Sequence, residues 1–341
     1  MLYGYQTTSI GRDPIVDLVT RWVHEANDAI TAGKWIVDII PWLEYLPGWL
    51  PGMGFKAIAR QYRRIYMLAA NIPFDFAKTQ KAEGSSKPSY TSSLLESDQT
   101  PYEIDQVKYS AATLFAGGSD TSVAVLGHFY LAVMLYPEVQ KKAQEEIDRV
   151  IGSDRLPEFQ DRPNLPYVEA LLTETLRWRP IISLGVPHMS DQEDEFQGYR
   201  IPKGSIILQS IAWFGRDPES YPEPERFDPE RFLGPNKQTD PRTFIFGFGR
   251  RICPGRHVAD ANLFLVIAKS LASFDVRKAV DSDGKDIEPV LGSVPGLVSH
   301  PQPFKCSIKP RSEKYRELIA NVDIEHPPEK GDAHLIPDLK L

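Results

Sequence analysis

The feature that most constrains this chain of 341 residues is a short stretch that places one cysteine at the start of a predicted helix. Residues 246–255 read FGFGRRICPG, and Pro254, directly after Cys253, suits the first turn of a helix. An apolar pattern with helical spacing follows over residues 258–267. Unpaired backbone amides and the positive end of the helix dipole favour a thiolate at such a position. The stretch therefore predicts a cysteine with a chemical role.

The residues around Cys253 suit a flat, bulky ligand with an anionic substituent. Gly249 and Gly255 let the backbone come close to such a group, and Arg251 supplies a fixed cation. A single thiolate in an apolar bay opened by glycines suits the axial ligand of a heme iron. The alternative is a buried structural cysteine, the usual role of a lone cysteine. Cys306 lacks the glycines, the arginine and the helix start, so we expect Cys253 to be the ligand.

This stretch resembles the heme-binding loop of the cytochrome P450 family. The residues at the fixed positions of that loop are Phe246, Gly249, Arg251, Cys253 and Gly255. The resemblance implies a mainly α fold with small β-sheets, a heme b cofactor and Cys253 as the axial thiolate. It begins in the middle of the family fold and continues to near residue 310. We therefore expect an N-terminally truncated P450-like domain over residues 1–310 and a surface tail over residues 311–341.

A second motif lies in the longest predicted helix, over residues 102–135. Gly117 and Gly118 stand in mid-helix, where each glycine costs about 1 kcal/mol relative to alanine and usually has a reason. Here they would leave room for a cofactor and bound oxygen. The hydroxyl of Thr121 can turn from the helix backbone toward a ligand, and Asp120 can relay protons. The segment matches the family's oxygen-activation segment, which implies catalytic roles for Asp120 and Thr121; a glycine kink at a helix crossing is the alternative.

A third motif combines one glutamate with two arginines. Glu174 and Arg177 lie three residues apart on a predicted helix and can pair, although such pairs are common and usually weak. Residues 227–232 read FDPERF and resemble the family's second arginine motif. The resemblance implies that Glu174, Arg177 and Arg231 form a buried structural network that holds the thiolate loop.

Further residues take their expected roles from the same resemblance. His188 lies where many relatives place a basic residue against a heme propionate; a surface or packing role is the alternative. Residues 181–187 and 294–298 match segments that normally line the substrate pocket. The reductase is expected to bind a cationic face that includes Arg250, Arg256 and His257. The alternative is that these three residues carry ordinary surface charge.

Composition restricts the partners and the location. The net charge of −7, without a block of basic residues, gives no sign of nucleic-acid binding. Two cysteines exclude a disulfide framework and a four-cysteine zinc site. The sequence contains no run of 18 apolar residues, so it predicts no transmembrane segment. Residues 35–55 are rich in Trp and Pro, and we expect them either to contact a membrane surface or to pack on their own domain. For a full-length relative the resemblance implies the cytosolic face of the endoplasmic reticulum membrane.

Periodicity predicts other elements. Amphipathic helices are expected from Pro14 and from Ile58, the second ending at Pro73. Strands are expected at residues 199–201 and 205–208, with the intervening Pro-Lys-Gly as the turn of a hairpin.

Together these features predict a heme-thiolate monooxygenase that resembles fungal members of the family and acts in secondary metabolism. It would insert one oxygen atom from O2 into an apolar organic small molecule, with electrons from NADPH through a flavin-containing reductase. One alternative is a heme-thiolate isomerase or dehydratase, but such enzymes often lack the acid–alcohol pair. Another is an inactive heme-binding fragment, because the first part of a family chain is absent.

Overall fold

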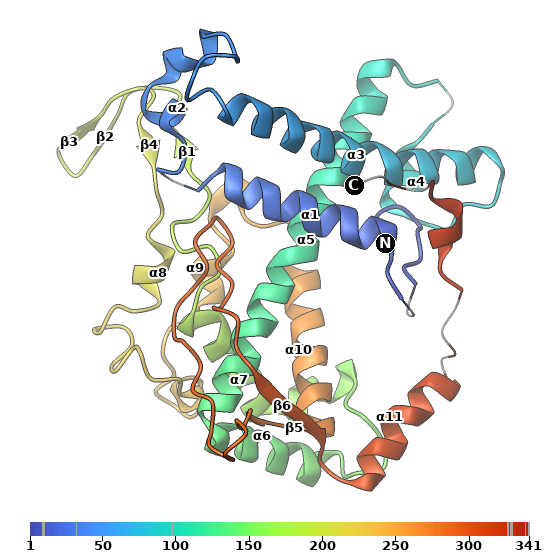
Figure 1. The fold of residues 1–341 in the computed structure, drawn as a ribbon. Helices are drawn as coiled ribbons and strands as arrows, with labels where there is room; N and C mark the ends of the chain where they lie inside the picture. The colour runs from blue at the N-terminus through green and yellow to red at the C-terminus, as the bar shows by residue number, and fades with distance from the viewer. Residues whose placement is uncertain are drawn as a thin grey trace. The chain divides into compact units, whose positions relative to one another are not determined.

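The structure is a computed structural model that describes residues 1–8, 11–31, 33–96, 98–325, 327, 330–337 and 339. The chain divides into two compact units. The first comprises Met1–Asp120 and His326–Leu341, and the second comprises Thr121–Glu325. The described residues form mainly helices with small sheets, which confirms the predicted fold class (Figure 1).

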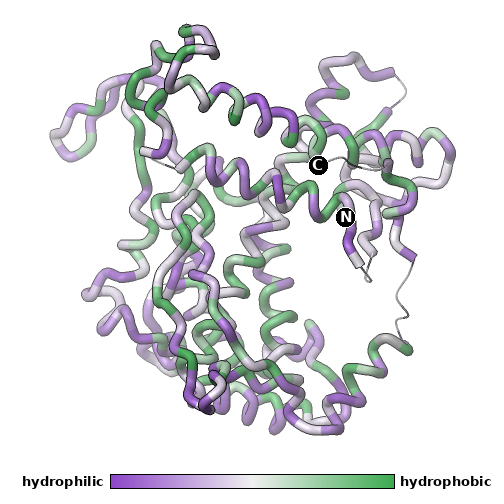
Figure 2. Tube along the Cα trace, viewed as in Figure 1, coloured by the Kyte–Doolittle hydropathy of each residue, from purple (hydrophilic) through white to green (hydrophobic). Residues whose placement is uncertain are grey.

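The first unit is built on two amphipathic helices, α1 (Pro14–Ala29) and α3 (Phe55–Ala82). Hydrophobic and hydrophilic residues follow one another along both helices (Figure 2). Asp13 caps α1 by accepting hydrogen bonds from the amides of Ile15 and Val16. Leu18 of α1 and Ile65 of α3 are buried in one cluster. The other elements are α2 (Ile36–Ile39), η1 (Pro41–Tyr45), α4 (Tyr90–Leu94), the first part of α5 (Pro101–Leu135) and η5 (Asp332–Leu335).

Helix α3 continues through Pro73, so the prediction that it ends there is wrong. Proline removes one backbone hydrogen bond and usually breaks or kinks a helix. Pro73, Phe74 and Ala77 are buried on the packed face of α3. Burial of these apolar side chains offsets the lost bond, which the local pattern alone does not reveal.

The second unit has its core between α6 (Pro137–Val150), α7 (Pro166–Trp178) and α10 (Arg256–Ser273). Ile147, Leu171 and Phe264 are fully buried there. Because α7 is buried on nearly every side, it forms a fixed base for the segments that surround it. The short elements of this unit are η2 (Phe159–Asn164), α8 (Ile211–Phe214), η3 (Pro229–Phe232), α9 (Arg242–Ile245) and η4 (Gly249–Arg251).

The described strands form three two-stranded antiparallel sheets. Their pairs are β1 (His188–Met189) with β4 (Ile206–Ile207), β2 (Asp194–Phe196) with β3 (Tyr199–Ile201), and β5 (Phe274–Lys278) with β6 (Cys306–Pro310).

The two strands predicted near residue 200 exist, but the prediction that they pair with each other is wrong. β3 pairs with β2 through a two-residue turn, in which Gln197 and Gly198 have φ values of 52° and 82°. A turn with positive φ at both central residues matches the twist of antiparallel strands. A Pro-Lys-Gly connection is a weaker hairpin former, and it leads instead to β4.

Residues after β6 form α11 (Glu313–Glu325), which is anchored to α6 by one carboxylate. Two nitrogens of the Arg311 guanidinium donate to the two oxygens of Asp148 at 2.9 and 2.6 Å. The buried Tyr315 donates its hydroxyl to the same carboxylate at 3.0 Å. Burial opposes the charged form of Asp148, but the bonds from Arg311 and Tyr315 outweigh it and lower its pKa. The division at residue 310 stays a prediction.

No single helix among the described residues is long and apolar enough to cross a bilayer. Helices α5 and α6 have the required length and composition only when taken together, and the chain bends by 102° between them.

We predict that the docking of α11 weakens in acid because of Asp148. A carboxylate whose pKa is lower in the folded protein stabilises it above the ordinary aspartate pKa, and that contribution disappears as the pH falls through the lowered value. Asp148→Asn should weaken docking at neutral pH by about 1 kcal/mol or less, since the pair is partly exposed. Protection of α11 amides from hydrogen exchange measures this. The control is Asp154→Asn, which removes only the exposed partner of Lys314. Equal protection of α11 in wild-type and Asp148→Asn protein at neutral pH would contradict this role.

Candidate functional site

The loop that carries Cys253 is a tight turn closed by its own backbone. The Cys253 amide donates to the carbonyl oxygen of Phe246 at 2.8 Å, and the Ile252 amide donates to that of Gly249 at 3.2 Å. Gly247 and Gly249 have φ values of 77° and 58°, a region that favours glycine. The glycines therefore permit the turn that presents the cysteine just before α10.

The surroundings of the Cys253 thiol suit a flat ligand bound at its sulfur. Cys253 is a half-buried, free cysteine. A Cβ atom added to Gly255 would lie 3.9 Å from the sulfur, and one added to Gly249 would meet no atom within 4 Å. The exposed Arg251 completes the set with a cation. One free cysteine sulfur, glycines beside open space and one cation fit a heme with anionic propionates.

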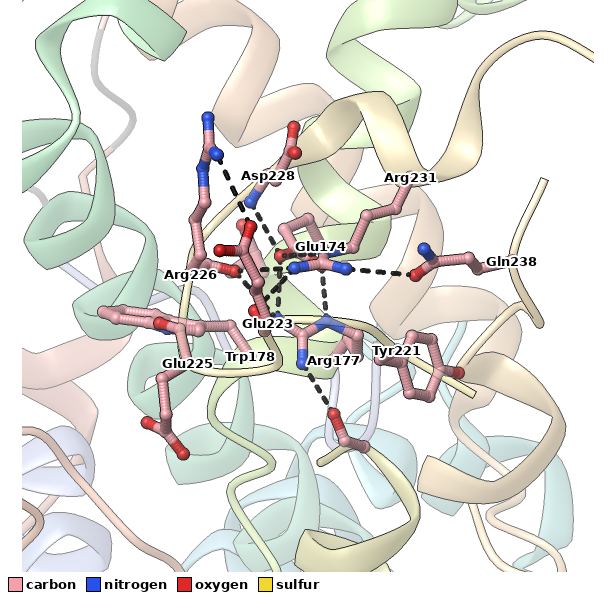
Figure 3. A network of polar contacts seen from close by, with 12 residues as sticks. Glu174, Arg177, Trp178, Tyr221, Glu223, Glu225, Arg226, Asp228, Arg231 and Gln238 are labelled. Atoms are coloured by element: carbon pink, nitrogen blue, oxygen red, sulfur yellow. Dashed lines mark hydrogen bonds and ion pairs between the residues drawn. The ribbon is translucent and has the colours of Figure 1, made fainter. Parts of the chain in front are cut away.

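The buried ion pair between Glu174 and Arg177 forms the centre of a polar network (Figure 3). Both side chains are 0% exposed. Arg177 donates from Nε and Nη2 to the two carboxylate oxygens of Glu174 at 2.6 and 2.8 Å. Its Nη1 donates to the carbonyl oxygen of Gly215 at 2.6 Å. The guanidinium also lies 5.3 Å from the ring centroid of Tyr221. The predicted pairing of Glu174 with Arg177 is therefore present and buried.

Arg231 joins this network from the segment that leads to the cysteine loop. Its Nε lies 3.5 Å from Oε1 of Glu174. It donates to the carbonyl oxygens of Pro222 and Glu223. The Asp228 amide donates to Oε1 of Glu174 at 2.8 Å. One carboxylate thus joins α7 to residues 222–231, and the role of these three residues in holding the thiolate loop stays a prediction.

The electrostatics of Glu174 make the network sensitive to the loss of any partner. Burial raises the pKa of Glu174, whereas Arg177, the Asp228 amide and Arg231 act in the opposite direction. A buried carboxylate is tolerated only when such donors surround it. Loss of one partner would therefore leave a buried charge or polar group without its bond, which is costly.

The family model described as Cytochrome P450 matches residues 10–308. This chain belongs to the cytochrome P450 family. Proteins of the family hold a heme whose iron is bound by a cysteine thiolate.

The chain is also similar to curated P450 proteins of fungi. It is 45% identical over 344 residues to the cytochrome P450 monooxygenase CLM2 of Gibberella zeae, covering 98% of this chain and 65% of that protein. It is 47% identical over 322 residues to the cytochrome P450 monooxygenase 208 of Postia placenta, covering 94% and 62%. The multifunctional cytochrome P450 monooxygenase af510 of Aspergillus fumigatus is 41% identical over 344 residues, covering 98% and 64%. The chain thus spans 62–65% of the length of these relatives.

The P450 helix α5 contains the predicted oxygen-activation residues. The helix runs without interruption through residues 116–122. A Cβ added to Gly117 or Gly118 would meet no atom within 4 Å, so both border open space. Asp120 and Thr121 are half-buried; Asp120 belongs to the first unit, and the second unit begins at Thr121. Their catalytic roles stay predictions.

The remaining predicted contacts of this P450 lie at the surface. His188 is exposed on β1 opposite Ile207. Arg250 and His257 are exposed, and Arg256 donates from Nε to Nε2 of His257 at 3.1 Å. The propionate contact of His188 and the reductase-binding role of the other three residues stay predictions.

Sequence reasoning missed two glycines in the second unit of this P450. A Cβ at Gly215 would lie 2.8 Å from the carbonyl oxygen of Arg177, and the Gly215 carbonyl is itself a partner of that arginine. Nothing in the sequence around Gly215 signals this contact. Gly247 adopts positive φ beside Gly249, and the FGFG pattern did carry that signal.

We predict that breaking the buried ion pair of Glu174 and Arg177 destabilises the second unit. Glu174→Gln leaves the Arg177 guanidinium buried without a counter-charge, which should lower the free energy of unfolding by about 3–5 kcal/mol. Urea denaturation measures the change. The matched control is Glu193→Gln, which breaks the exposed ion pair with Arg200 and should change stability by less than about 1 kcal/mol. Similar losses for the two variants would contradict the structural role of Glu174.

Proposed function

We propose that this chain forms the heme-thiolate part of a monooxygenase that inserts one oxygen atom from O2 into an apolar organic substrate. The observation that carries the proposal is the Cys253 loop, in which a half-buried free thiol lies among glycines at the start of α10. The buried network centred on Glu174 supports it, because it ties the segment leading to that loop to α7.

Each side chain at the proposed site has one task. Cys253 provides the thiolate ligand, and Gly249, Gly255 and Phe246 shape its loop. Arg251 and His188 bind the anionic propionates. When bound, the thiolate-ligated heme activates O2 for transfer of one oxygen atom.

Proton delivery is assigned to α5. Asp120 collects protons from solvent, and the hydroxyl of Thr121 holds a proton beside the oxygen-binding face. Gly117 leaves that face open; in support, a Cβ atom added to it would meet no atom within 4 Å. The acid–alcohol pair favours a monooxygenase over a heme-thiolate isomerase or dehydratase, which needs no external protons.

Electrons are proposed to come from NADPH through a flavin-containing reductase. Arg250, Arg256 and His257 lie near the start of α10, and Arg250 and His257 are exposed. A cationic patch next to the thiolate loop suits the acidic surface of an electron donor.

Contact with a membrane surface is proposed for residues 35–55. Trp42, Tyr45 and Trp49 are 60%, 81% and 80% exposed, which favours interfacial contact over packing on their own unit. The corresponding location is the cytosolic face of the endoplasmic reticulum. Similarity to fungal monooxygenases supports a role in secondary metabolism.

Ligation of iron by Cys253 has a direct spectroscopic test. We predict that the heme-loaded chain, once reduced, gives the red-shifted carbonyl band of a thiolate-bound heme. Cys253→Ser should abolish that band, and the control Cys306→Ser should retain it, because Cys306 lies in β6. A normal band in Cys253→Ser protein would exclude Cys253 as the ligand. Heme uptake with this band but without reductase-driven turnover would favour the alternative of an inactive heme-binding fragment.

A second variant tests proton delivery. With reductase, NADPH and heme present, Thr121→Ala should still consume NADPH but release peroxide, with product formation at least roughly 10-fold lower. The neighbouring Ser122→Ala is the control, because adjacent helical residues face different directions. Unchanged coupling of NADPH to product in Thr121→Ala would mean that Gly117 and Gly118 have only a structural role.

A further inference from the structure

A second ionic cluster joins residues that precede and follow the cysteine loop in the chain, and it shares no residue with the network centred on Glu174. Its four members come from four elements of the second unit. They are Arg162 of η2, Glu169 of α7, Arg242 of α9 and Asp260 of α10. We call this set the four-residue ring.

The ring is closed by charge-assisted hydrogen bonds. Arg242 donates from Nε to Oδ1 of Asp260 at 2.7 Å and from Nη2 to Oε1 of Glu169 at 2.9 Å. Arg162 donates to both oxygens of Glu169 at 2.9 and 3.0 Å. Nη1 of Arg162 lies 2.7 Å from Oδ2 of Asp260. Each arginine therefore bridges the same two carboxylates, and Arg242 also donates from Nη1 to Oδ2 of the more exposed Asp240 at 3.1 Å.

The position of the ring in the sequence connects it to Cys253. Arg242 lies four residues before Phe246, whose carbonyl oxygen accepts the Cys253 amide. Asp260 lies on α10, seven residues after Cys253. The bond between Arg242 and Asp260 therefore joins the two ends of the segment that contains the ligand. Closing a short loop in this way restricts the conformations that it can reach.

Other contacts attach this closed segment to the core. Arg242 also donates from Nη1 to the hydroxyl of Thr173 on α7 at 2.9 Å. The guanidinium of Arg162 lies 4.8 Å from the ring centroid of Phe264, which is fully buried on α10. The loop is thus held to two core helices as well as to itself.

The ring differs from an ordinary surface ion pair in burial and in the number of its bonds. Its side chains are 20–34% exposed, and isolated exposed pairs contribute little unless they form bidentate networks. Burial opposes the charge on Asp260, but the bonds from Arg162 and the charge of Arg242 lower its pKa. Asp260 therefore remains ionised near neutral pH.

We propose that Arg242 and Asp260 are positioning residues for the cysteine ligand, with Arg162 and Glu169 fixing their ion pair to α7. The proposal rests on the proposed role of Cys253 as the ligand. Outer residues that orient a metal ligand commonly change metal affinity by about 10–100-fold when altered. The ring is such an outer set, and it acts by keeping the thiol in one position before the cofactor binds.

The test uses the chain without heme and reads the cysteine directly. Cys253 and Cys306 are both half-buried, so the rate at which each reacts with iodoacetamide rises as its surroundings open further. Mass spectrometry of one digest gives both rates. Asp260→Asn, which keeps the shape and removes the charge, should raise the rate of Cys253 labelling about 10-fold. The rate at Cys306 should change less than about 2-fold, since local opening of the loop does not expose β6.

A matched variant separates positioning from general loss of an ion pair. Arg155 binds both oxygens of Asp161 at 2.7 Å, so Asp161→Asn removes a bidentate partner of the same kind. This control should leave the labelling of Cys253 unchanged. Asp260→Glu, which keeps the charge, should restore slow labelling in part. If Asp260→Asn does not fold, Arg242→Lys provides a milder change, because lysine keeps the charge but lacks the fork.

The outcomes are distinct. Selective acceleration at Cys253 in Asp260→Asn or Arg242→Lys supports the proposal. An unchanged Cys253 rate, equal acceleration at both cysteines, or equal effects of Asp260→Asn and Asp161→Asn would overturn it. Because labelling needs no heme, failure here leaves the carbonyl spectrum of Cys253→Ser as a separate test of the ligand itself.

Discussion

The structure around the proposed heme ligand depends on one buried interaction, the ion pair of Glu174 and Arg177 (Figure 3). Neither side chain contacts solvent, so each charge is stable only while the other is present. The pair also bonds to backbone groups of Gly215, Arg226 and Asp228, which belong to segments that connect the helices. An irregular stretch of chain thereby acquires a fixed path toward Cys253.

Helix α7 is the common base for this path because polar groups on it hold two different segments. Glu174 and Arg177 bind residues 215–231, whereas Glu169 and Thr173 bind Arg242 directly before the loop. The rest of α7 is buried against α6 and α10, which prevents it from shifting when one contact changes. A thiol on a flexible loop would lose conformational entropy on binding iron; a thiol held in this way has already lost it.

The sequence predicted the parts of this arrangement that depend on local pattern. The glycines, the arginine and the proline around Cys253 specify a turn and a helix start, and Glu174 and Arg177 share a face at helical spacing. Pairing across distance was less predictable. The strand at residues 199–201 pairs backward through Gln197 and Gly198, and α3 passes through Pro73 because tertiary burial outweighs the local break. The partners of Arg177 at Gly215 and of Arg242 at Asp260 lie 38 and 18 residues away, with no local signal.

The central claim is that this loop presents Cys253 as the single sulfur ligand of a heme iron. X-ray absorption at the iron edge tests it most directly, because it reports the atoms bound to the metal without requiring turnover. The heme-loaded chain should show one sulfur in the first coordination shell of the iron. In Cys253→Ser protein a lighter atom should replace that sulfur. An iron bound only by nitrogen and oxygen in the wild-type chain would contradict the account.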